Sequence, residues 1–539
     1  MFNRIYLRAL VGLACAVATL PGSVAAQALD ASGETGQEPP ELARECRAAW
    51  IASVSNIDWP SRPGLPVERQ KAELQALLDR AVSLRLNAVI LQIRPACDAL
   101  YASPREPWSE YLTGRQGTPP EPLYDPLAFA VEEAHARGLE LHAWLNPYRA
   151  RVLEDGQSDP APQHISVSKP HLVKRYGRYL WLDPGESEVQ EHSLGVIMDV
   201  VKRYDVDAIH MDDYFYPYRE PVIGLDGKQA SDAKGKPLYI PFPDDASYAR
   251  YQTGGGKLAR DDWRRDNVNR FVKRLYQAIK LEKPGVKLGI SPFGIWKAGH
   301  PAQIKGMSQY DAIYADARLW LARGWVDYFA PQLYWSIENP DQSYPILLKW
   351  WVEQNTHQRH IWPGLFTSRV REAGDRGFVA RQIAYQINWT RLQPGASGHI
   401  HFSIKAMADE PPGVGPLLRG EAYKLPALMP ATPWLAGKPP AVPRLAMAKD
   451  AERQALNVTI SPRPGTVPWL WTVYARQGGR WKTEIAPATR VEWRFPLKGP
   501  EALEALHVAG VDRQAQEGPR ARMVIQATAD ASVTPRPLP

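Results

Sequence analysis

The chain has 539 residues, of which 44% are hydrophobic and 23% are charged, and its formal net charge is +7. This composition is ordinary for a folded protein, and the length fits one large domain followed by a smaller one. It excludes a chain that is disordered throughout. The sequence has neither a long run of basic residues nor a zinc-finger pattern, so nothing in it indicates nucleic acid as a partner.

The first 28 residues have the features of a secretory signal peptide. Arg4 and Arg8 precede an apolar stretch over 9–20, which is too short to span a membrane and is followed by small-x-small cleavage sites. We therefore expect a protein of the periplasm or one that is secreted. The alternative is a lipid anchor at Cys15, in a poor lipobox, which would give peripheral membrane association. Residues 29–43 are polar and are expected to form a flexible leader.

Between residues 44 and 424, short apolar runs alternate with amphipathic helices, which is typical of a parallel sheet with crossover helices. Eight such runs favour an α/β fold of the (β/α)₈ TIM-barrel type over an open doubly wound sheet. The runs cover 46–53, 87–94, 139–146, 207–213, 287–293, 326–334, 360–365 and 398–403. Cys46 and Cys97 fall at opposite ends of neighbouring strands, so we expect two free thiols.

Helices are expected from Val67, from Pro126, over 196–204 and over 262–282. The second has clear signals, since Asp125 is an N-cap residue and Gly138 a stop. Long segments follow the third and fourth strands and should lie on the catalytic face of the barrel. They span 147–187 and 214–261.

The last part of the chain predicts a second, all-β domain. Residues 425–443 are rich in proline and are expected to be a semi-rigid linker. Residues 444–530 contain strand-like runs that predict a small β-sandwich, at 455–460, 469–476, 490–495, 506–512 and 523–527. Its segment 507–519 resembles the penultimate-strand region of fibronectin type III domains. Residues 531–539 are expected to be a tail.

Catalytic groups of such barrels lie where the strands end at their carboxyl edge. The fourth run ends in His210, Asp212, Asp213 and Tyr214. Two adjacent acids should titrate as a coupled pair with one raised pKa. Glycoside hydrolysis needs one carboxylic acid as proton donor and a second carboxylate as nucleophile or base. A structural ion pair and a metal site are the competing interpretations.

A further catalytic carboxylate is less evident. Glu338, just beyond the sixth run, is the first candidate, and Asp98 and Asp183 compete with it. For Glu338 the alternative is an exposed loop acid, and Asp183 also fits a helix cap.

Polar and aromatic residues at the other strand ends are candidates for binding substrate. Arg94 could hold a carboxylate in its ionised form or bind an acidic sugar substituent, and Asn146 and Gln332 suit sugar hydroxyls. Structural hydrogen bonds would also explain all three. The candidate stacking residues, for which core filling is the alternative, are Trp144, Tyr148, Tyr214, Tyr334 and Trp335. The patterns HExxH, GxGxxG and GxSxG are absent from the sequence, so we expect neither a metal nor another cofactor.

Several segments in order resemble one known family. They are RAAWIASVSNIDWPS, LNAVILQIRPACDALYAS, LELHAWLNPYR, IHMDDYFYP, VDYFAPQLYW and GHIHFS, between about Arg44 and Lys405. They are similar to glycosyl-hydrolase-like family 10, which includes a divisome-localised glycosyl hydrolase. The resemblance implies a TIM-barrel glycosidase of the cell envelope whose partner is a polysaccharide, namely peptidoglycan glycan strands stripped of stem peptides. It marks Asp212 and Asp213 as the acidic motif of the family.

Two other functions remain compatible with the sequence. One is a non-catalytic glycan-binding protein that keeps the barrel but has lost turnover. The other is a metal-dependent polysaccharide deacetylase, for which the histidines at the strand ends would be ligands.

Overall fold

A computed structural model describes residues 38–153, 157–224, 226–372, 374, 377–410, 413–526 and 534–537. The expected signal peptide, Cys15 and the leader up to residue 37 lie outside the described residues. In the described part of the chain, no helix is both long enough and apolar enough to cross a membrane. Cys46 and Cys97 are both buried and free, as predicted.

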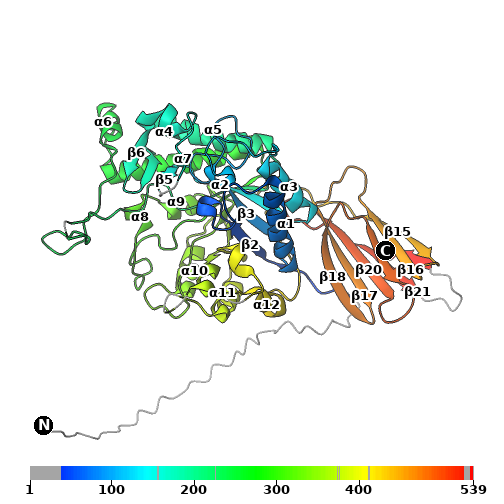
Figure 1. Ribbon diagram of the computed structural model, residues 1–539. Coiled ribbons are helices and arrows are strands. Elements are labelled where there is room, and N and C mark those ends of the chain that lie inside the picture. The colour runs from blue at the N-terminus through cyan, green and yellow to red at the C-terminus, as the bar shows by residue number, and fades with distance from the viewer. Residues whose placement is uncertain are drawn as a thin grey trace, which may run out of the picture.

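The first domain is built around a parallel sheet with the order β11-β10-β9-β8-β4-β3-β2-β13-β12 (Figure 1). Its strands are β2 (Cys46–Ile51), β3 (Ala88–Arg94), β4 (Glu140–Leu145), β8 (Ala208–Met211), β9 (Lys287–Ile290), β10 (Tyr328–Phe329), β11 (His360–Ile361), β12 (Gly364–Leu365) and β13 (Gly398–His401). Every strand lies within one of the eight predicted runs.

The sheet closes into a barrel through the seventh run. Its first half, β11, pairs with β10, and its second half, β12, pairs with β13. Pro363 lies between the halves and has no N–H to donate, which interrupts the ladder. Because β11 and β12 are halves of one strand, the sheet has no free edge, which is the predicted (β/α)₈ architecture.

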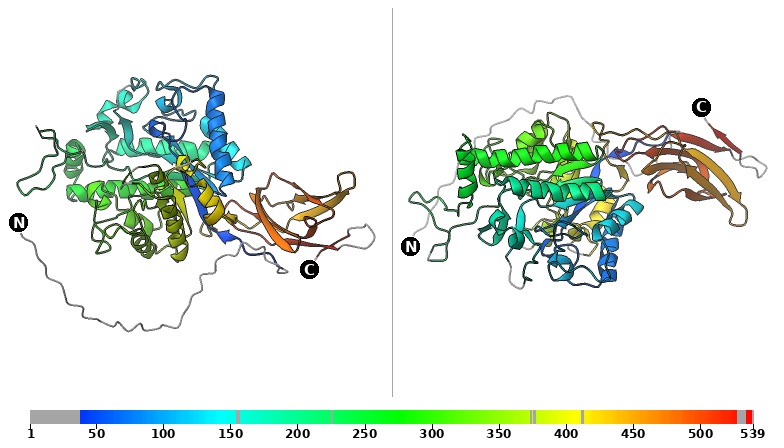
Figure 2. Two further views of the ribbon diagram at one scale, coloured as in Figure 1. Left: turned by 60° about the horizontal axis from the view of Figure 1, so that its bottom comes forward. Right: turned by 90° about the horizontal axis from the view of Figure 1, so that it is seen from above.

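The crossover helices lie around the outside of the sheet (Figures 1 and 2). They are α1 (Val67–Ser83), α3 (Pro126–Ala136), α5 (Ser187–Arg203), α7 (Arg260–Glu282), α9 (Ala317–Ala322), α10 (Tyr344–Glu353) and α11 (Ala380–Leu392). The predicted start of α3 is confirmed, since the side chain of Asp125 accepts hydrogen bonds from the backbone N–H groups of Leu127 and Ala128. Helix α5 begins earlier than expected, because Ser187 and not Val196 is its first residue.

Short helical turns complete the first domain. They are η1 (Val54–Asn56), α2 (Glu110–Thr113), α4 (Ile165–Ser168), η2 (Pro170–Leu172), α6 (Asp245–Thr253), α8 (Gln309–Ala312), η3 (Thr367–Arg371), η5 (Ile404–Met407), α12 (Gly415–Leu417) and η6 (Leu418–Ala422). The expected insertion 147–187 forms a small sheet of order β5-β7-β6, with β5 (Arg149–Val152), β6 (Val173–Tyr176) and β7 (Tyr179–Leu182). Figure 1 shows this sheet and α6 at the end of the molecule far from the second domain.

The barrel interior is packed with large side chains. Trp50, Tyr328 and Trp362 point into it and are buried, and the rings of Tyr328 and Trp362 stack at 4.5 Å. Small residues such as Gly289 make room for them, since a Cβ there would meet the Tyr328 ring. The interior is therefore a core that supports the strand ends above it.

The second domain contains two antiparallel sheets, as predicted for a β-sandwich. One has the order β15-β16-β19, and the other β18-β17-β20-β21-β22. Their strands are β15 (Arg444–Asp450), β16 (Ala455–Ser461), β17 (Leu470–Gln477), β18 (Arg480–Pro487), β19 (Glu492–Pro496), β20 (Leu503–Val511), β21 (Ala521–Gln526) and β22 (Thr534–Pro537). Strand β22 falls within the expected tail, and its prolines are compatible with its place at the edge of the sheet.

The β-sandwich contacts the amino-terminal end of the barrel. Arg513 forms ion pairs with Asp205 and Asp207, just before β8. Trp434, from the expected linker, donates a hydrogen bond to Asp327, just before β10. Also in this segment, β14 (Ala427–Leu428) pairs with β1 (Ala43–Arg44), so it is packed against the barrel. The second domain thus lies at the opposite end from the carboxyl edge.

Candidate active site

Asp212 and Asp213 lie directly after β8, at the carboxyl edge of the barrel. Their exposed fractions are only 4% and 3%. Since burial disfavours a charged carboxylate, each must be stabilised by donors or remain protonated. The two acids meet this requirement in different ways.

Asp212 is surrounded by hydrogen-bond donors. Its Oδ1 accepts from Nδ2 of Asn146 at 3.0 Å and from the backbone N–H of Tyr214 at 3.3 Å, and its Oδ2 accepts from Nε1 of Trp144 at 3.2 Å. Burial raises the pKa of Asp212, while the nearby charge of Arg149 and these donors oppose the rise. The surroundings therefore favour its ionised form more than burial alone would.

The surroundings of Asp213 favour its protonated, uncharged form. The phenol of Tyr218 donates a hydrogen bond to its Oδ2, and the side chain of Gln332 is its second hydrogen-bond partner. Burial, and then the adjacent charge of Asp212, raise the pKa of Asp213 to about 7 in spite of these bonds. Two neighbouring carboxyls in unequal surroundings, one of them with a pKa near 7, are compatible with acid–base catalysis by a carboxyl pair.

His210 lies one layer below the pair, in the barrel centre. Its Nε2 accepts a hydrogen bond from Nε1 of Trp50 at 3.1 Å, and its Nδ1 lies 2.8 Å from the Tyr328 hydroxyl. Because an indole only donates, Nε2 carries no proton and Nδ1–H donates to Tyr328. Burial lowers the pKa of His210 well below its ordinary value, so the ring is neutral. It supports the site from beneath and forms no bond to either aspartate.

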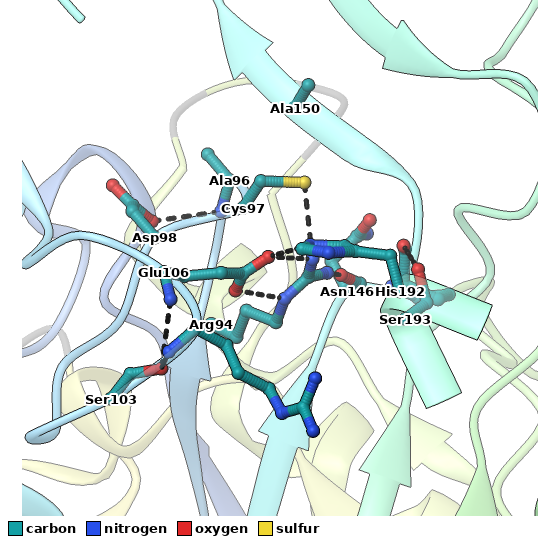
Figure 3. Close-up of polar contacts among 12 residues, drawn as sticks. Arg94, Ala96, Cys97, Asp98, Ser103, Glu106, Asn146, Ala150, His192 and Ser193 are labelled. Carbon is teal, nitrogen blue, oxygen red and sulfur yellow. Dashed lines mark hydrogen bonds and ion pairs between the residues drawn. The ribbon is translucent and has the colours of Figure 1, made fainter. Parts of the chain in front are cut away.

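Arg94 acts on the site through Asn146. Figure 3 shows its guanidinium between Glu106 and Asn146. Its Nε donates to Glu106 at 2.6 Å, and another N–H group donates to the main-chain carbonyl of Asn146. Burial alone would raise the pKa of Glu106, but Arg94 and His192 lower it to about 2. Arg94 thus holds a carboxylate of the protein itself in its ionised form, one of the two roles considered for it.

The other candidate acids have surroundings of their own. Asp98 is buried beside Gln116, and burial raises its pKa to about 7. Asp183 accepts from Ser247 at 2.6 Å and from the N–H of Gly185 at 2.9 Å, which ties the two insertions together. Glu338 lies in an exposed loop after β10 and forms no ion pair within the described ranges.

The aromatic candidates divide into buried and partly exposed rings. Trp144 is 7% exposed and donates a hydrogen bond to Asp212. Tyr148 is fully buried and packs against Phe271. Tyr214, Tyr334 and Trp335 are partly exposed. Only this second group is available to a ligand.

Further partly exposed rings, which the sequence did not single out, continue this group. Tyr218 contacts Phe293 at 6.3 Å between ring centroids, and Phe293 contacts Trp335 at 5.5 Å. Phe366 lies 4.8 Å from Tyr334. Phe293 and Phe366 follow the ends of β9 and β12, which is the signal that could have found them, whereas Tyr218 lies in a loop. Aromatic rings flanking an acid pair are suited to stacking on sugar rings.

Metal ligation has no obvious place in the described part of the chain. No group of three or more His, Cys, Asp or Glu side chains there is arranged to hold a metal ion. The histidines considered as ligands have protein partners, as His401 has in Thr367 and Tyr423.

A TIM barrel with a buried acid pair and aromatic rings at its carboxyl edge is typical of glycoside hydrolases. The chain belongs to the glycosyl hydrolase-like 10 family, whose model matches residues 45–378. This confirms the family resemblance found in the sequence.

Named relatives agree with this assignment. The chain is 40% identical over 456 residues to glycosyl hydrolase YngK of Bacillus subtilis (strain 168), covering 82% of this chain and 85% of that protein. It is 35% identical over 341 residues to glycosyl hydrolase DigH of Escherichia coli (strain K12), covering 59% of this chain and 73% of that protein. Among solved structures, the PgaB (BpsB) glycoside hydrolase domain from Bordetella bronchiseptica aligns with a TM-score of 0.42 and 14% identity, covering 71% of this chain and 100% of that one.

Proposed function

We propose that the protein is an exported glycoside hydrolase that cleaves glycosidic bonds of an envelope polysaccharide, namely peptidoglycan glycan strands without stem peptides. The observation that carries the proposal is the unequal environment of Asp212 and Asp213. One carboxyl is surrounded by donors, and the pKa of the other is raised to about 7. Family membership supports the glycosidase class, and the substrate is our inference from the sequence resemblance.

In this proposal Asp213 is the general acid. Its pKa of about 7 keeps a proton available for the leaving oxygen at neutral pH and below. Asp212 is the ionised carboxylate, held by Asn146 and Trp144, and acts as nucleophile or base. As the pH rises through about 7, Asp213 loses its proton, so cleavage should slow.

The surrounding rings would bind the glycan. Tyr214, Tyr334 and Trp335 are partly exposed near the acids, and sugars present apolar faces that stack on such rings. Gln332 contacts both Asp213 and the backbone carbonyl of Ser291, so it is suited to fixing the acid against a bound sugar.

Export and the role of the second domain are also part of the proposal. The N-terminal segment supports a protein of the periplasm or one that is secreted, with a lipid anchor at Cys15 as the alternative. The two sheets support a fibronectin type III-like domain. Because this domain contacts the amino-terminal end of the barrel, it would orient the barrel rather than contribute catalytic groups.

The test is to incubate the purified protein, from residue 29 onward, with amidase-treated peptidoglycan and to analyse the soluble products by mass spectrometry. The control is Asp213→Asn, which keeps the size of the side chain but cannot donate an acidic proton. We expect short glycan fragments from the wild type alone, and their ends would identify the bond that is cut. Fragments from both proteins, or from neither, would contradict the proposal.

A non-catalytic glycan-binding protein is the second candidate. It is favoured by the exposed loop position of Glu338, which leaves the second catalytic carboxylate unassigned outside the adjacent pair. This function predicts that the wild type sediments with the glycan and releases no fragments in the same incubation.

A further inference from the structure

Arg149 is a buried cation of the candidate active site that has no acidic partner. It is the first residue of β5, and only 5% of it is exposed. In the part of the chain that the structure describes, it forms no ion pair. Burying a charge without a partner is costly, and the other arginine of β5, Arg151, is paired with Glu110 at 3.2 Å. An unpaired arginine in such a place is therefore a candidate for binding a ligand.

Contacts on two sides place Arg149 beside Asp212. Its backbone N–H donates to Oδ1 of Asn146 at 2.8 Å, and Nδ2 of the same asparagine donates to Asp212 at 3.0 Å. Its guanidinium lies over the ring of Tyr214, 4.9 Å from the centroid, and the backbone N–H of Tyr214 also donates to Asp212. The charge of Arg149 opposes the rise that burial causes in the pKa of Asp212, which agrees with this geometry.

The terminal amino groups of Arg149 are free to bind. Its Nε donates to the carbonyl of Pro95 at 2.9 Å, and this is the one side-chain hydrogen bond that Arg149 forms within the described residues. Stacking on Tyr214 uses the face of the guanidinium, whereas its N–H donors lie in the plane and stay available. Neither Nη atom is among the fully buried polar atoms that lack a partner, so both are reachable by solvent. Two parallel donors are thus open to a ligand beside Asp212.

The chemistry of a sugar indicates which group reaches these donors. In the proposed reaction the carboxylate of Asp212 faces the anomeric carbon, C1, as nucleophile or base. Because C2 is bonded to C1, the substituent on C2 lies next to the same carboxylate. In an N-acetylated sugar this substituent is an acetamido group, which has a carbonyl oxygen that accepts hydrogen bonds and an apolar methyl group. A guanidinium beside an aromatic ring offers a partner to each.

The charges at this place favour a neutral acceptor. The ionised carboxylate of Asp212 compensates part of the charge of Arg149, and it would repel a second anion. A free amino group on C2, protonated in mildly acidic solution, would compete with Arg149 for Asp212 and leave the guanidinium donors without an acceptor. An acetamido oxygen accepts hydrogen bonds and brings no charge.

We propose that Arg149 binds the acetamido oxygen of the sugar whose glycosidic bond is cleaved, and so makes the enzyme selective for glycan that is N-acetylated at this sugar. The inference rests on the proposed function and adds a requirement on the C2 substituent, which is independent of whether the strand carries peptides. A sugar without the acetyl group would leave the donors of a nearly buried guanidinium unpaired, and unpaired buried groups give strong discrimination between substrates.

The test compares two substrates on each protein. Peptide-free glycan strands are used either as isolated or after chemical removal of the N-acetyl groups, and part of the deacetylated material is acetylated again to control for damage to the polymer. We expect kcat/KM of the wild type to be about 100-fold higher on the acetylated strands, and the second acetylation to restore cleavage. In Arg149→Met the ratio of the two kcat/KM values should fall below about fivefold, because the donors are gone.

This ratio does not depend on how much of a preparation is folded, so a destabilised variant remains informative. Arg149→Lys is the second variant. It keeps the charge but lacks the planar pair of donors, so its ratio should fall between those of the wild type and Arg149→Met. The matched control is Arg151→Met, which removes a buried arginine of the same strand and should keep the wild-type ratio.

Equal cleavage of both strands by the wild type, or an unchanged ratio in either Arg149 variant, would overturn the inference while the proposed glycosidase activity stands. A ratio that falls equally in Arg151→Met would also overturn it, because the effect would then follow from the loss of any buried arginine of β5. If the wild type cleaves neither strand, the proposed function fails, and the inference fails with it.

Discussion

Asn146 joins Arg94 to Asp212: its side-chain amide donates to Oδ1 of Asp212 at 3.0 Å, while its main-chain carbonyl accepts a hydrogen bond from Arg94. The same side chain accepts at its Oδ1 from the N–H of Arg149 at 2.8 Å. These bonds fix the side-chain conformation of Asn146, and Asn146 in turn fixes the orientation of the Asp212 carboxylate. The orientation of Asp212 therefore depends on Asn146 and, through it, on Arg94 and Arg149.

Replacing Asn146→Ala should lower the rate of glycan cleavage by up to about 100-fold, because Asp212 loses a donor and its orientation. Steady-state assays of reducing-end release would measure the loss, which should fall on kcat more than on KM. Asn457→Ala, in the second domain, is the matched control and should cleave at the wild-type rate. A fully active, folded Asn146→Ala protein would show that Asp212 needs no such support.

Replacing Tyr218→Phe should move the alkaline limit of activity upward by about one pH unit. The Tyr218 phenol donates to Asp213 and lowers its pKa, so its removal stabilises the protonated acid. The measurement is kcat/KM against pH for both proteins. Tyr248→Phe, which removes a phenol bonded to the carbonyl of Leu258, should leave the profile unchanged. A downward shift in Tyr218→Phe would contradict the assigned contact.

Replacing Asp213→Asn should stabilise the protein at alkaline pH while it abolishes cleavage. The folded-state pKa of Asp213, about 7, exceeds the unfolded value, so the folded state binds more protons between the two. The wild type therefore loses stability as the pH rises towards 7, and the asparagine variant does not share this loss.

Urea unfolding at pH ~8 should show a free energy of unfolding higher by about 1–3 kcal/mol in Asp213→Asn, and the difference should vanish at pH ~4. Asp98 and Asp183, whose pKa values burial also raises, are present in both proteins and cancel. A variant less stable than the wild type at alkaline pH would argue that Asp213 is an ionised structural group.

Replacing Arg94→Met should destabilise the protein by about 3–5 kcal/mol, because Glu106 would be left buried without its main partner. The measurement is the midpoint of denaturant unfolding. Arg80→Met, near the end of α1, is the control and should change stability by less than about 0.5 kcal/mol. Retained stability in Arg94→Met would mean that Glu106 is not held by this pair.

The barrel could be predicted from the sequence because its strands are buried on both sides and read as apolar runs. The run 87–94 is one such segment, and all residues of β3 are buried. The strands of the second domain were harder to predict from the sequence. Strands β15 and β18 were not among the predicted runs, since their exposed positions carry charged residues and few apolar ones mark a core face.

At the site, the sequence identified the acid pair but not how it is held. Asp212 and Asp213 were evident because adjacent acids at the end of an apolar run are costly to bury. Glu106, which pairs with Arg94, and Tyr218, which contacts Asp213, lie in loops. Loop conformation depends on tertiary contacts that no local pattern records, so these partners, and the exposed position of Glu338, required the structure.

The most direct test of the central claim is the pH dependence of kcat/KM for cleavage of peptide-free glycan strands by the wild type. If Asp213 is the general acid, the rate should be high in mildly acidic solution and fall as the pH rises through about 7, tenfold per pH unit at the alkaline end. A rate that stays level or increases through that range would contradict the assignment of Asp213 as the proton donor.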